Sequence, residues 1–577
     1  MTTMIKTKQA MAERMPGRAA EHDVPRERSA VDQAPPLAAA AAAPRPMPRG
    51  LSAGALAALA AAPPTPPDAQ APIARLAPAG SPAGGGEAEG GAGGAATAGQ
   101  LPACKEGKVL HPDLINPNII KTQYAVRGEL YLRAEALRRE GRDIIFTNIG
   151  NPHNLGAKPK TFTRQVIALC AAPWLLDDPA AAALFPSDAA ARARKLLAAF
   201  TGGVGSYTDS RGNLAVRQEV ADFIERRDGH PANAEHIFLT DGASPAVRMC
   251  LTSLIRNQDD AILAPIPQYP LYSAAIQLLG GSLVPYDLDE SEGWALSLGS
   301  LKAAVGAARA AGKCVRALVF INPGNPTGKV LPRSNLEGLI RFAHEERLVL
   351  MADEVYQELV YRDDRPFFSA RKVLMDMGEP YSSSVELVSF HTVSKGTSGE
   401  CGLRGGYYEM VNFHPGTIDQ LYKVSSINLS PNSLGQVAMS CMVDPPRPGE
   451  PSHATWVAEQ GSEFESLKRR AALVAAGFNA LEGVSCSDTD GAMYSFPRLE
   501  LPPKAIAAAK AAGKAPDAYY CLRLLEEEGI VCVPGSGFGQ AEGTFHLRTT
   551  ILPREEKMKE FVAMFRTFHE KFMAEFK

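Results

Sequence analysis

Two kinds of hydrophobic pattern alternate along the chain from about residue 103 onward. Apolar residues recur at helical spacing in segments such as 128–140 (GELYLRAEALRRE) and 212–229, and the second of these ends at Gly229. Short, continuous apolar runs lie elsewhere, for example in 143–150 (DIIFTNIG) and in 384–395. The helical period predicts amphipathic helices, whereas apolar runs of about four to eight residues predict buried strands. The chain is therefore predicted to alternate helices and strands.

The order of these patterns predicts the fold class. Strand, turn and helix follow one another in 236–255 and again in 260–280, and 336–356 reads as a helix leading into a strand. Short buried strands alternating with helices are typical of an α/β fold with a largely parallel sheet covered on both faces. Ligands of such sheets bind beyond the carboxyl ends of the strands. Polar residues follow five of the strands and are predicted to meet in one crevice: Asp241–Ser244, Tyr269, Asn325, Asp353 and Lys395.

The first hundred residues differ in kind from the rest. Segment 1–102 is rich in Ala, Pro and Gly and almost without aromatic or β-branched residues, so it is predicted to be disordered. It is also a candidate targeting segment, because Lys and Arg are dispersed near its start. Its acidic residues are atypical of transit peptides: Glu13, Glu21, Asp23, Glu27 and Asp32.

Composition changes this picture little. The 577 residues are 45% hydrophobic and 21% charged, with a net charge of −3, which indicates no nucleic-acid or membrane partner. No apolar run reaches the roughly 18 residues that a membrane span needs. The nine cysteines show no CxxC pair and no histidine at zinc-ligand spacing, so neither a disulfide framework nor a metal site is expected.

Segment 389–410 (SFHTVSKGTSGECGLRGGYYEM) indicates an anion site. Its glycines are typical of backbone brought close to a ligand, and Thr392 and Ser394 supply hydroxyl donors. Arg404 offers a permanently charged, bidentate clamp. Ser244 opens a helix after a strand, where free N–H groups favour a phosphate. Taken singly, each hydroxyl would more often be a cap or a turn residue.

Lys395 indicates which ligand the anion site binds. A lysine directly after a buried strand is costly unless it is paired, neutral or covalently attached. A phosphate site beside such a lysine suggests pyridoxal 5′-phosphate held as a Schiff base. Asp353 would then keep the pyridine nitrogen protonated, while Tyr356 and Asn325 would bond the phenolic oxygen and Tyr269 would stack on the ring. The alternative for Asp353 is a helix N-cap.

These residues carry a family resemblance that covers about residues 103–577. NPGNPTG (322–328), ADEVY (352–356) and the lysine segment resemble the class I/II, fold-type I pyridoxal-phosphate aminotransferases. GECGLRGGY (399–407) resembles the alanine aminotransferase branch, which includes glutamate:glyoxylate aminotransferases, and so do YAVRGEL, NIGNPH and TDGASPAVR. The nine positions from Lys395 to Arg404, where many members of the class have eight, are also similar to that branch.

The resemblance implies roles for individual residues. Lys395 is implied to be the Schiff-base lysine and general base, with Asp353 and Tyr356 also catalytic. Tyr207 is implied to reach the phosphate of the neighbouring subunit in a homodimer. Gly150 and Asn325 are implied to lie beside the substrate, and Arg548 to grip its α-carboxylate. The implied cofactor contacts are Lys395, Ala243, Ser244, Tyr269, Asn325, Asp353, Tyr356, Thr392, Ser394, Arg404 and Tyr207.

The resemblance also implies an architecture and a reaction. A large cofactor-binding domain (196–440) is expected beside a smaller α+β domain built from 441–577 and from 103–195, which also supplies linking helices. The expected reaction moves the amino group of L-alanine to 2-oxoglutarate, giving pyruvate and L-glutamate by a ping-pong mechanism. The expected partners are small amino acids and 2-oxoacids, and the expected compartment is mitochondrial or cytoplasmic.

Several alternatives stay open. Within the resemblance they are a glutamate:glyoxylate aminotransferase, another class I/II aminotransferase, and a lyase such as aminocyclopropane-carboxylate synthase. Segment 534–543 (PGSGFGQAEG) approximates a dinucleotide fingerprint, but Gln540 stands at the third glycine position. A non-enzymatic regulator of the same fold would need an added DNA-binding module, and no basic helix pattern is present in the first 102 residues.

Overall fold

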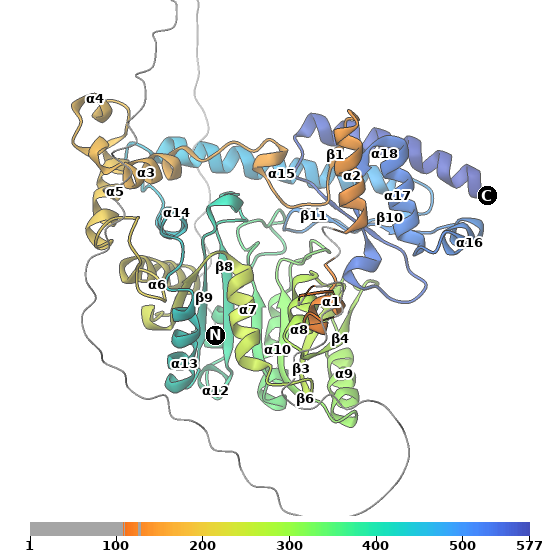
Figure 1. Cartoon of the computed structure of the whole chain (residues 1–577), viewed down its shortest axis with the longest axis horizontal. Helices are drawn as coiled ribbons and strands as arrows, with labels where there is room; N and C mark the ends of the chain where they lie inside the picture. The colour runs from red at the N-terminus through yellow and green to blue at the C-terminus, as the bar shows by residue number, and fades with distance from the viewer. Residues whose placement is uncertain (1–107, 109, 113, 125–127) are drawn as a thin grey trace, which may run out of the picture. The chain divides into compact units, whose positions relative to one another are not determined.

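A computed structural model describes residues 108, 110–112, 114–124 and 128–577, all of which belong to one compact unit (Figure 1). The predicted disorder of residues 1–102 lies outside the described residues. The central feature is an eight-stranded sheet in the order β2-β9-β8-β7-β6-β3-β4-β5. Its strands are β2 (Ile237–Thr240), β3 (Asp260–Ile266), β4 (Ser282–Asp289), β5 (Ala295–Leu296), β6 (Cys314–Ile321), β7 (Val349–Asp353), β8 (Leu387–Thr392) and β9 (Gly406–Val411).

Most of the sheet is parallel. Strands β4, β3, β6, β7 and β8 pair in parallel, whereas β5 and β9 run antiparallel to their neighbours. Because β9 is antiparallel to both β8 and β2, β2 has the same direction as β8. The mostly parallel sheet that the sequence predicts is confirmed.

Neighbouring residues of the strands point to opposite faces, and each face is covered by helices. Leu318, Leu350 and Leu387 pack on one face and Val319, Met351 and Val388 on the other. The first layer contains α9 (Leu298–Ala310), α10 (Arg333–Glu346) and α11 (Ala370–Asp376), which lies beside α12 (Tyr381–Ser384). The second layer contains α7 (Ala243–Leu254), α8 (Leu271–Leu278) and α13 (Pro415–Ile427), with α1 (Pro117–Lys121) against α8.

A further group of helices packs at the end of the sheet formed by β2 and β9. Val216, Val220 and Ile224 of one helix share a core with Ile237 and Tyr407 of the sheet. That helix ends at Gly229, as the sequence predicts, and Gly229 adopts a left-handed conformation with φ +77°. The members of this group are α3 (Thr161–Ala171), α5 (Ser187–Ala199), α6 (Leu214–Asp228) and α14 (Ser433–Val443), with α4 (Pro179–Ala182) nearby.

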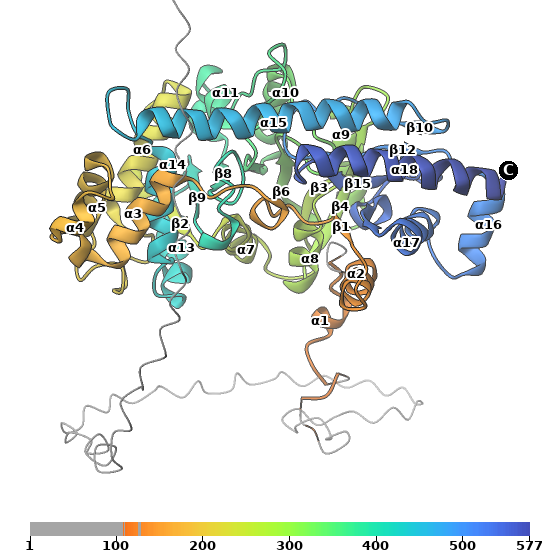
Figure 2. The ribbon, with the colours of Figure 1, turned by 90° about the horizontal axis from the view of Figure 1, so that it is seen from above.

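A smaller α+β part joins the two ends of the described chain. Strand β1 (Ile145–Phe146) pairs in parallel with β13 (Ile530–Val531), and β15 pairs with β11 and β14. Figure 2 shows the long helix α15 lying beside α18. The other elements are α2 (Glu129–Arg139), α15 (His453–Asn479), β10 (Val484–Ser485), β11 (Tyr494–Ser495), β12 (Arg498–Leu499), α16 (Pro503–Ala511), α17 (Pro516–Glu528), β14 (Val533–Pro534), β15 (Leu547–Thr550) and α18 (Glu555–Phe576).

Two local structures bear on the alternatives. After Asp353 the chain makes turns and no helix, so Asp353 is not an N-cap. The glycines of 534–543 form a short 3-10 helix, Gly535–Phe538, and no crossover helix follows that would hold a dinucleotide pyrophosphate. Among the described residues, no helix is long and apolar enough to cross a membrane.

Candidate active site

The predicted crevice lies at the carboxyl edge of the sheet. Strands β2, β3, β6, β7 and β8 run in one direction, so their carboxyl ends share one edge. Asp353 ends β7, and Lys395 follows β8 by three residues. Arg404 lies just before β9. Because β9 runs antiparallel to β8, it begins at the edge of the sheet where β8 ends. The convergence of polar residues that the sequence predicts is therefore present.

The first part of the site is a cradle for an anion. Helix α7 begins at Ala243, followed by Ser244, and its N-cap residue Gly242 provides no side chain to occupy the free N–H groups. Arg404 lies across this helix start and donates 2.7 Å to the Asp241 carbonyl. Gly242 has φ +90°, a backbone conformation that favours glycine, and a Cβ there would also stand 2.4 Å from an Arg404 nitrogen.

Two hydroxyls complete the cradle. The Thr392 hydroxyl lies 3.1 Å from the Ser394 hydroxyl. The Ser394 hydroxyl in turn lies 3.5 Å from Nη1 of Arg404. The Ser394 N–H donates to the Thr392 hydroxyl at 3.1 Å, which fixes the turn between them. Free N–H groups, hydroxyls and a guanidinium together suit a phosphate group.

Lys395 lies at the centre of the site. Its Nζ donates 3.1 Å to the Gly150 carbonyl and lies 5.9 Å from the ring centroid of Tyr356. A Cβ on Gly150 would stand 2.6 Å from the Tyr494 hydroxyl and 3.1 Å from Nζ. Gly150 therefore lies close to Lys395 and Tyr494, and its expected place beside the substrate stays a prediction.

Asp353 is buried and only partly satisfied. Its Oδ2 accepts a hydrogen bond of 2.7 Å from the Tyr272 hydroxyl, while Oδ1 has no partner among the described residues. Burial raises the pKa of the Asp353 carboxyl to about 6, against the opposing effects of the Tyr272 hydrogen bond, the Val355 backbone N–H and the Lys395 charge. A buried carboxylate with a free oxygen indicates a missing cationic or N–H partner.

A series of hydrogen bonds connects the large sheet to the smaller α+β part across the site. Asn325 donates 3.4 Å to the Tyr356 hydroxyl, which lies 3.1 Å from the Tyr494 hydroxyl. Arg548 in turn donates 3.2 Å to Asn325. Burial raises the pKa of Tyr356 well above its usual range, so its phenol stays protonated and able to donate.

Arg548 is held between two aromatic rings. It is 1% exposed on β15, and its guanidinium carbon lies 4.5 Å from the Tyr494 centroid and 4.8 Å from that of Phe538. It donates one hydrogen bond to the Asn148 carbonyl, and its Nε has no partner among the described residues. A buried guanidinium with an unused donor is suited to bind a carboxylate.

Tyr269 and Tyr207 differ in where the structure places them. Tyr269 lies at the crevice, where its hydroxyl is 2.7 Å from that of Tyr124 in the segment before α2. Tyr207 is 76% exposed on the loop before α6 and makes no hydrogen bond with the crevice residues that the structure describes. Sequence reasoning gave no role to Tyr272, Tyr494, Phe538 or Tyr124, because aromatic residues at such positions look like ordinary core.

The donor set fits a phosphorylated pyridine aldehyde. The cradle around Gly242 suits the phosphate, and the unpartnered oxygen of Asp353 suits a protonated ring nitrogen. The Lys395 amine is the group that forms a covalent link to an aldehyde. The carboxyl edge of a parallel sheet with these three features is typical of enzymes that bind pyridoxal phosphate.

Comparisons with known proteins agree with this class and narrow it. Residues 176–565 match the family model described as aminotransferase class I and II, so the chain belongs to this family, whose members use pyridoxal phosphate. It is 58% identical over 469 residues to glutamate–glyoxylate aminotransferase 2 of Arabidopsis thaliana, covering 81% of this chain and 98% of the relative. It is 50% identical over 473 residues to alanine aminotransferase 2 of Panicum miliaceum, with 80% and 98% covered.

A solved structure of the same fold is alanine aminotransferase from Pyrococcus furiosus. The TM-score is 0.64 at 22% identity, covering 79% of this chain and 99% of that one. At this identity the likeness concerns the fold alone, which is that of a fold-type I aminotransferase. The predicted fold class and family are therefore confirmed.

Proposed function

We propose that this enzyme transfers the amino group of L-alanine reversibly to 2-oxoglutarate, giving pyruvate and L-glutamate. One geometric relation carries the amino-transfer part of this proposal. Arg548 donates to the Asn148 carbonyl and Lys395 to the Gly150 carbonyl, and these two carbonyls are two residues, or about 7 Å at most, apart. A substrate whose α-carboxylate binds Arg548 therefore has its α-carbon near the Lys395 amine.

The cofactor is assigned to residues that the crevice brings together. Lys395 would carry pyridoxal phosphate covalently, and Asp353 would face the ring nitrogen. Asn325 and Tyr356 would bond the phenolic oxygen, and Tyr269 would cover the ring. Bound in this way, the ring withdraws electrons from the substrate α-carbon. The phosphate would be held by Ala243, Ser244, Thr392, Ser394 and Arg404, with Tyr207 of a partner subunit.

The chain's own groups then perform distinct tasks. Arg548 holds the carboxylate common to every amino acid and oxoacid in the reaction. Once a substrate amine had displaced it, the Lys395 amine would be placed to take the α-proton as a general base and to deliver it to the cofactor as a general acid. The carbonyl of Gly150, 3.1 Å away, holds the lysine in place. Because one site serves both oxoacids in turn, the kinetics are expected to be ping-pong.

The substrate pair rests on the relatives. Both names reported above are those of aminotransferases, one for alanine and one for glutamate and glyoxylate. Glutamate:glyoxylate transfer is therefore the second candidate, while another class I/II aminotransferase and a pyridoxal-phosphate lyase rank lower. Purified enzyme should be assayed with alanine, glutamate, glycine and aspartate against pyruvate, 2-oxoglutarate and glyoxylate. Alanine with 2-oxoglutarate is expected to be among the fastest pairs, and a faster aspartate reaction would contradict the substrate assignment.

We further propose a homodimer. Tyr207 is 76% exposed, which is unusual for a large aromatic residue unless a partner covers it. Leu429 and Ile427 are also exposed, and Leu429 accepts a hydrogen bond from Ser210 on the Tyr207 loop, so this face is continuous. Sedimentation equilibrium should give twice the chain mass. The compartment, mitochondrial or cytoplasmic, stays a prediction that subcellular fractionation can test.

A further inference from the structure

The segment between Lys395 and Arg404 contains a buried glutamate that the proposed mechanism does not use. The side chain of Glu400 is only 3% exposed, and both of its carboxylate oxygens have a partner. Arg164 donates 3.0 Å from Nε to one carboxylate oxygen and 2.6 Å from Nη2 to the other. This is a bidentate pair, the strongest geometry available to these two groups.

Glu400 also closes the loop that carries the lysine. Its backbone N–H donates 2.8 Å to the Val393 carbonyl, so residues 393–400 form a loop with Lys395 inside it. Its own carbonyl accepts from Leu403 at 3.1 Å, which starts the 3-10 helix Cys401–Leu403. The position of the Glu400 side chain is therefore coupled to the position of the Lys395 backbone.

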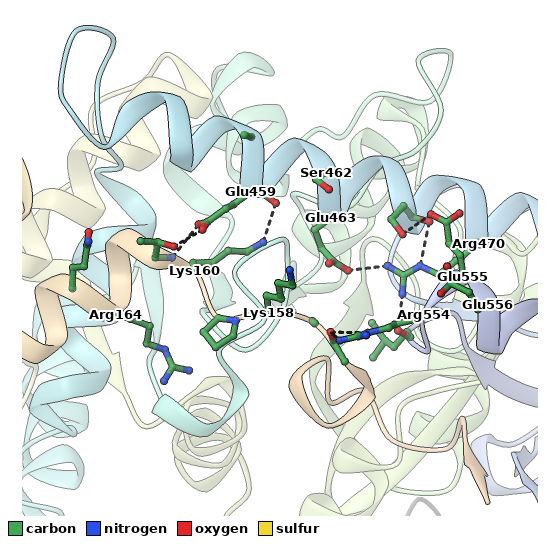
Figure 3. A pocket seen from close by; sticks show the side chains of 18 of the residues that line it. Lys158, Lys160, Arg164, Glu459, Ser462, Glu463, Arg470, Arg554, Glu555 and Glu556 are labelled. Carbon is green, nitrogen blue, oxygen red and sulfur yellow. Dashed lines mark hydrogen bonds and ion pairs between the residues drawn. The ribbon is translucent and has the colours of Figure 1, made fainter. Parts of the chain in front are cut away.

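Arg164 is anchored independently of that loop. It lies on α3, whose first residue Thr161 donates its N–H to Glu459 of α15 at 3.0 Å. The neighbouring Lys160 donates to the Glu459 carbonyl at 3.1 Å. Figure 3 shows these contacts beside a cavity of about 1050 Å³, with the Arg164 guanidinium directed away from α15. The arginine is thus held by a helix fixed to α15.

The segment that leads from Gly150 to α3 also contacts the lysine loop near Gly150, far from Arg164 in the segment. Gly399, with φ +62°, leaves room for Pro152, whose side-chain carbons would lie 3.3 Å from a Cβ at that position. The Cys401 thiol contacts the Ser394 carbonyl at 3.0 Å and lies 3.7 Å from the Gly150 carbonyl. Segment 150–164 therefore contacts the lysine loop or the residue after it at two places along the segment, near Gly150 and at Arg164.

We propose that Glu400 and Arg164 are a positioning pair that holds the lysine loop against segment 150–164, so that Lys395 stays within reach of the Gly150 carbonyl and of the substrate α-carbon. The inference rests on the proposed role of Lys395 as the proton carrier. A shift of the loop would separate the buried carboxylate from Arg164, and also from His153 Nδ1, which lies 3.9 Å from Oε2 on the same segment, and such a separation is strongly unfavourable. Proton transfer is sensitive to displacements of about 1 Å, so this restraint supports the chemical step.

The decisive variant is Glu400→Gln, which keeps the side-chain size and removes the charge. Arg164 is 43% exposed, so water can solvate it and the chain should still fold. We expect kcat for alanine to fall about 10- to 100-fold, with KM changed by no more than about twofold. The primary isotope effect with α-deuterated alanine should increase, because proton transfer becomes more rate-limiting.

A matched control separates positioning from general stability. Glu219 is also a buried carboxylate, 7% exposed, paired at 2.6 Å with a half-exposed Lys195 on the helices α5 and α6. Glu219→Gln should lower the melting temperature about as much as Glu400→Gln while leaving kcat and the isotope effect unchanged. Equal losses of kcat in the two variants, or none in Glu400→Gln, would overturn the proposal.

A second readout does not depend on turnover. Pyridoxal phosphate added to cofactor-free protein and trapped with borohydride after fixed times reports how fast Lys395 reacts. Glu400→Gln should slow trapping about tenfold, and Arg164→Lys, which keeps the charge but loses the bidentate geometry, should lie between it and the wild type. Wild-type trapping rates in both variants would contradict the positioning role. Lys395→Ala that stayed active would instead contradict the proposed function itself.

Discussion

Tyr272 donates a hydrogen bond of 2.7 Å to one oxygen of Asp353 and leaves the other oxygen without a partner among the described residues. Because the carboxyl is buried, its pKa is raised to about 6. The fold therefore contains a buried carboxylate with one oxygen unpaired among the described residues, as expected of a site prepared for a protonated ring nitrogen.

Asp353→Asn should make the cofactor-free chain more stable at pH 8 and less active when loaded. The folded carboxyl holds its proton up to about pH 6, whereas the unfolded one releases it near 3.8, so wild-type stability falls as pH rises between these values. The loss amounts to about 3 kcal/mol at most and is absent in the variant. Thermal unfolding of cofactor-free protein at pH 4 and pH 8 should show a gain at pH 8 alone. A gain at both values would contradict the titration of Asp353.

Lys395→Ala should bind pyridoxal phosphate without a covalent link and lose turnover by about 10³-fold or more, because attachment and proton transfer both need its amine. Wild-type protein should be yellow, and borohydride should fix the cofactor to Lys395, as mass spectrometry of peptides would show. Lys302→Ala, at an exposed lysine on α9, is the control and should behave as wild type.

Arg404→Ala should weaken cofactor binding more than it slows the chemical step. The arginine joins the Asp241 carbonyl to the Ser394 hydroxyl at the start of α7, and its loss removes charge-assisted contacts to a phosphate. About 10- to 100-fold weaker binding is expected from equilibrium dialysis. At saturating cofactor kcat should largely recover, and if it does not, the division of roles between Arg404 and Asp353 is wrong.

Arg548→Lys should reduce kcat/KM about 10- to 100-fold for alanine and for 2-oxoglutarate alike, because a lysine cannot bind the shared α-carboxylate through two parallel hydrogen bonds. Steady-state kinetics of each half-reaction measure this. Arg498→Lys, a half-exposed arginine paired with Glu290, serves as the matched control. A loss of kcat/KM for only one of the two substrates would show that Arg548 binds the side chain of that substrate and not the shared α-carboxylate.

Glu358→Gln should flatten part of the pH dependence of stability. The Glu358 carboxylate packs against Gly396, directly after the lysine, and burial raises its pKa to about 7 despite a hydrogen bond from the Thr397 N–H. His391, 4.0 Å away, has its pKa lowered to about 3 by burial and stays neutral. Because the folded Glu358 keeps a proton that the unfolded one loses above about pH 4.5, wild-type stability falls up to about pH 7.

The measurement for Glu358 is the melting temperature of variant and wild type at pH 5 and pH 8. The two should nearly coincide at pH 5, where the wild-type carboxyl is protonated in the fold. At pH 8 the variant should melt somewhat higher, because the wild-type carboxylate is then charged although its side chain is only 28% exposed. Equal differences at both values would show that Glu358 does not titrate in this range.

Residues close to a strand end were predictable. Asp353 and Lys395 directly follow apolar runs, and a charge in that position needs a function or a partner, so the sequence marks them. The roles predicted for Arg548 and Gly150 come from the family resemblance alone, since nothing in their local pattern sets them apart. Tyr272 was missed because it lies on the apolar face of α8, where a tyrosine looks like core until its hydroxyl is seen to meet Asp353.

The sequence by itself determined the alternation of strands and helices, the mostly parallel arrangement of the sheet and the edge at which the polar residues gather, because these follow from local hydrophobic periodicity and from the way parallel strands share an edge. Only the tertiary structure decided which distant side chains meet. Glu400 and Arg164 are 236 positions apart, and Arg548 and Asn325 are 223 apart. Such pairs depend on how layers of helices pack against the sheet, which single-residue patterns do not encode. The unpartnered oxygen of Asp353 is likewise a property of that packing.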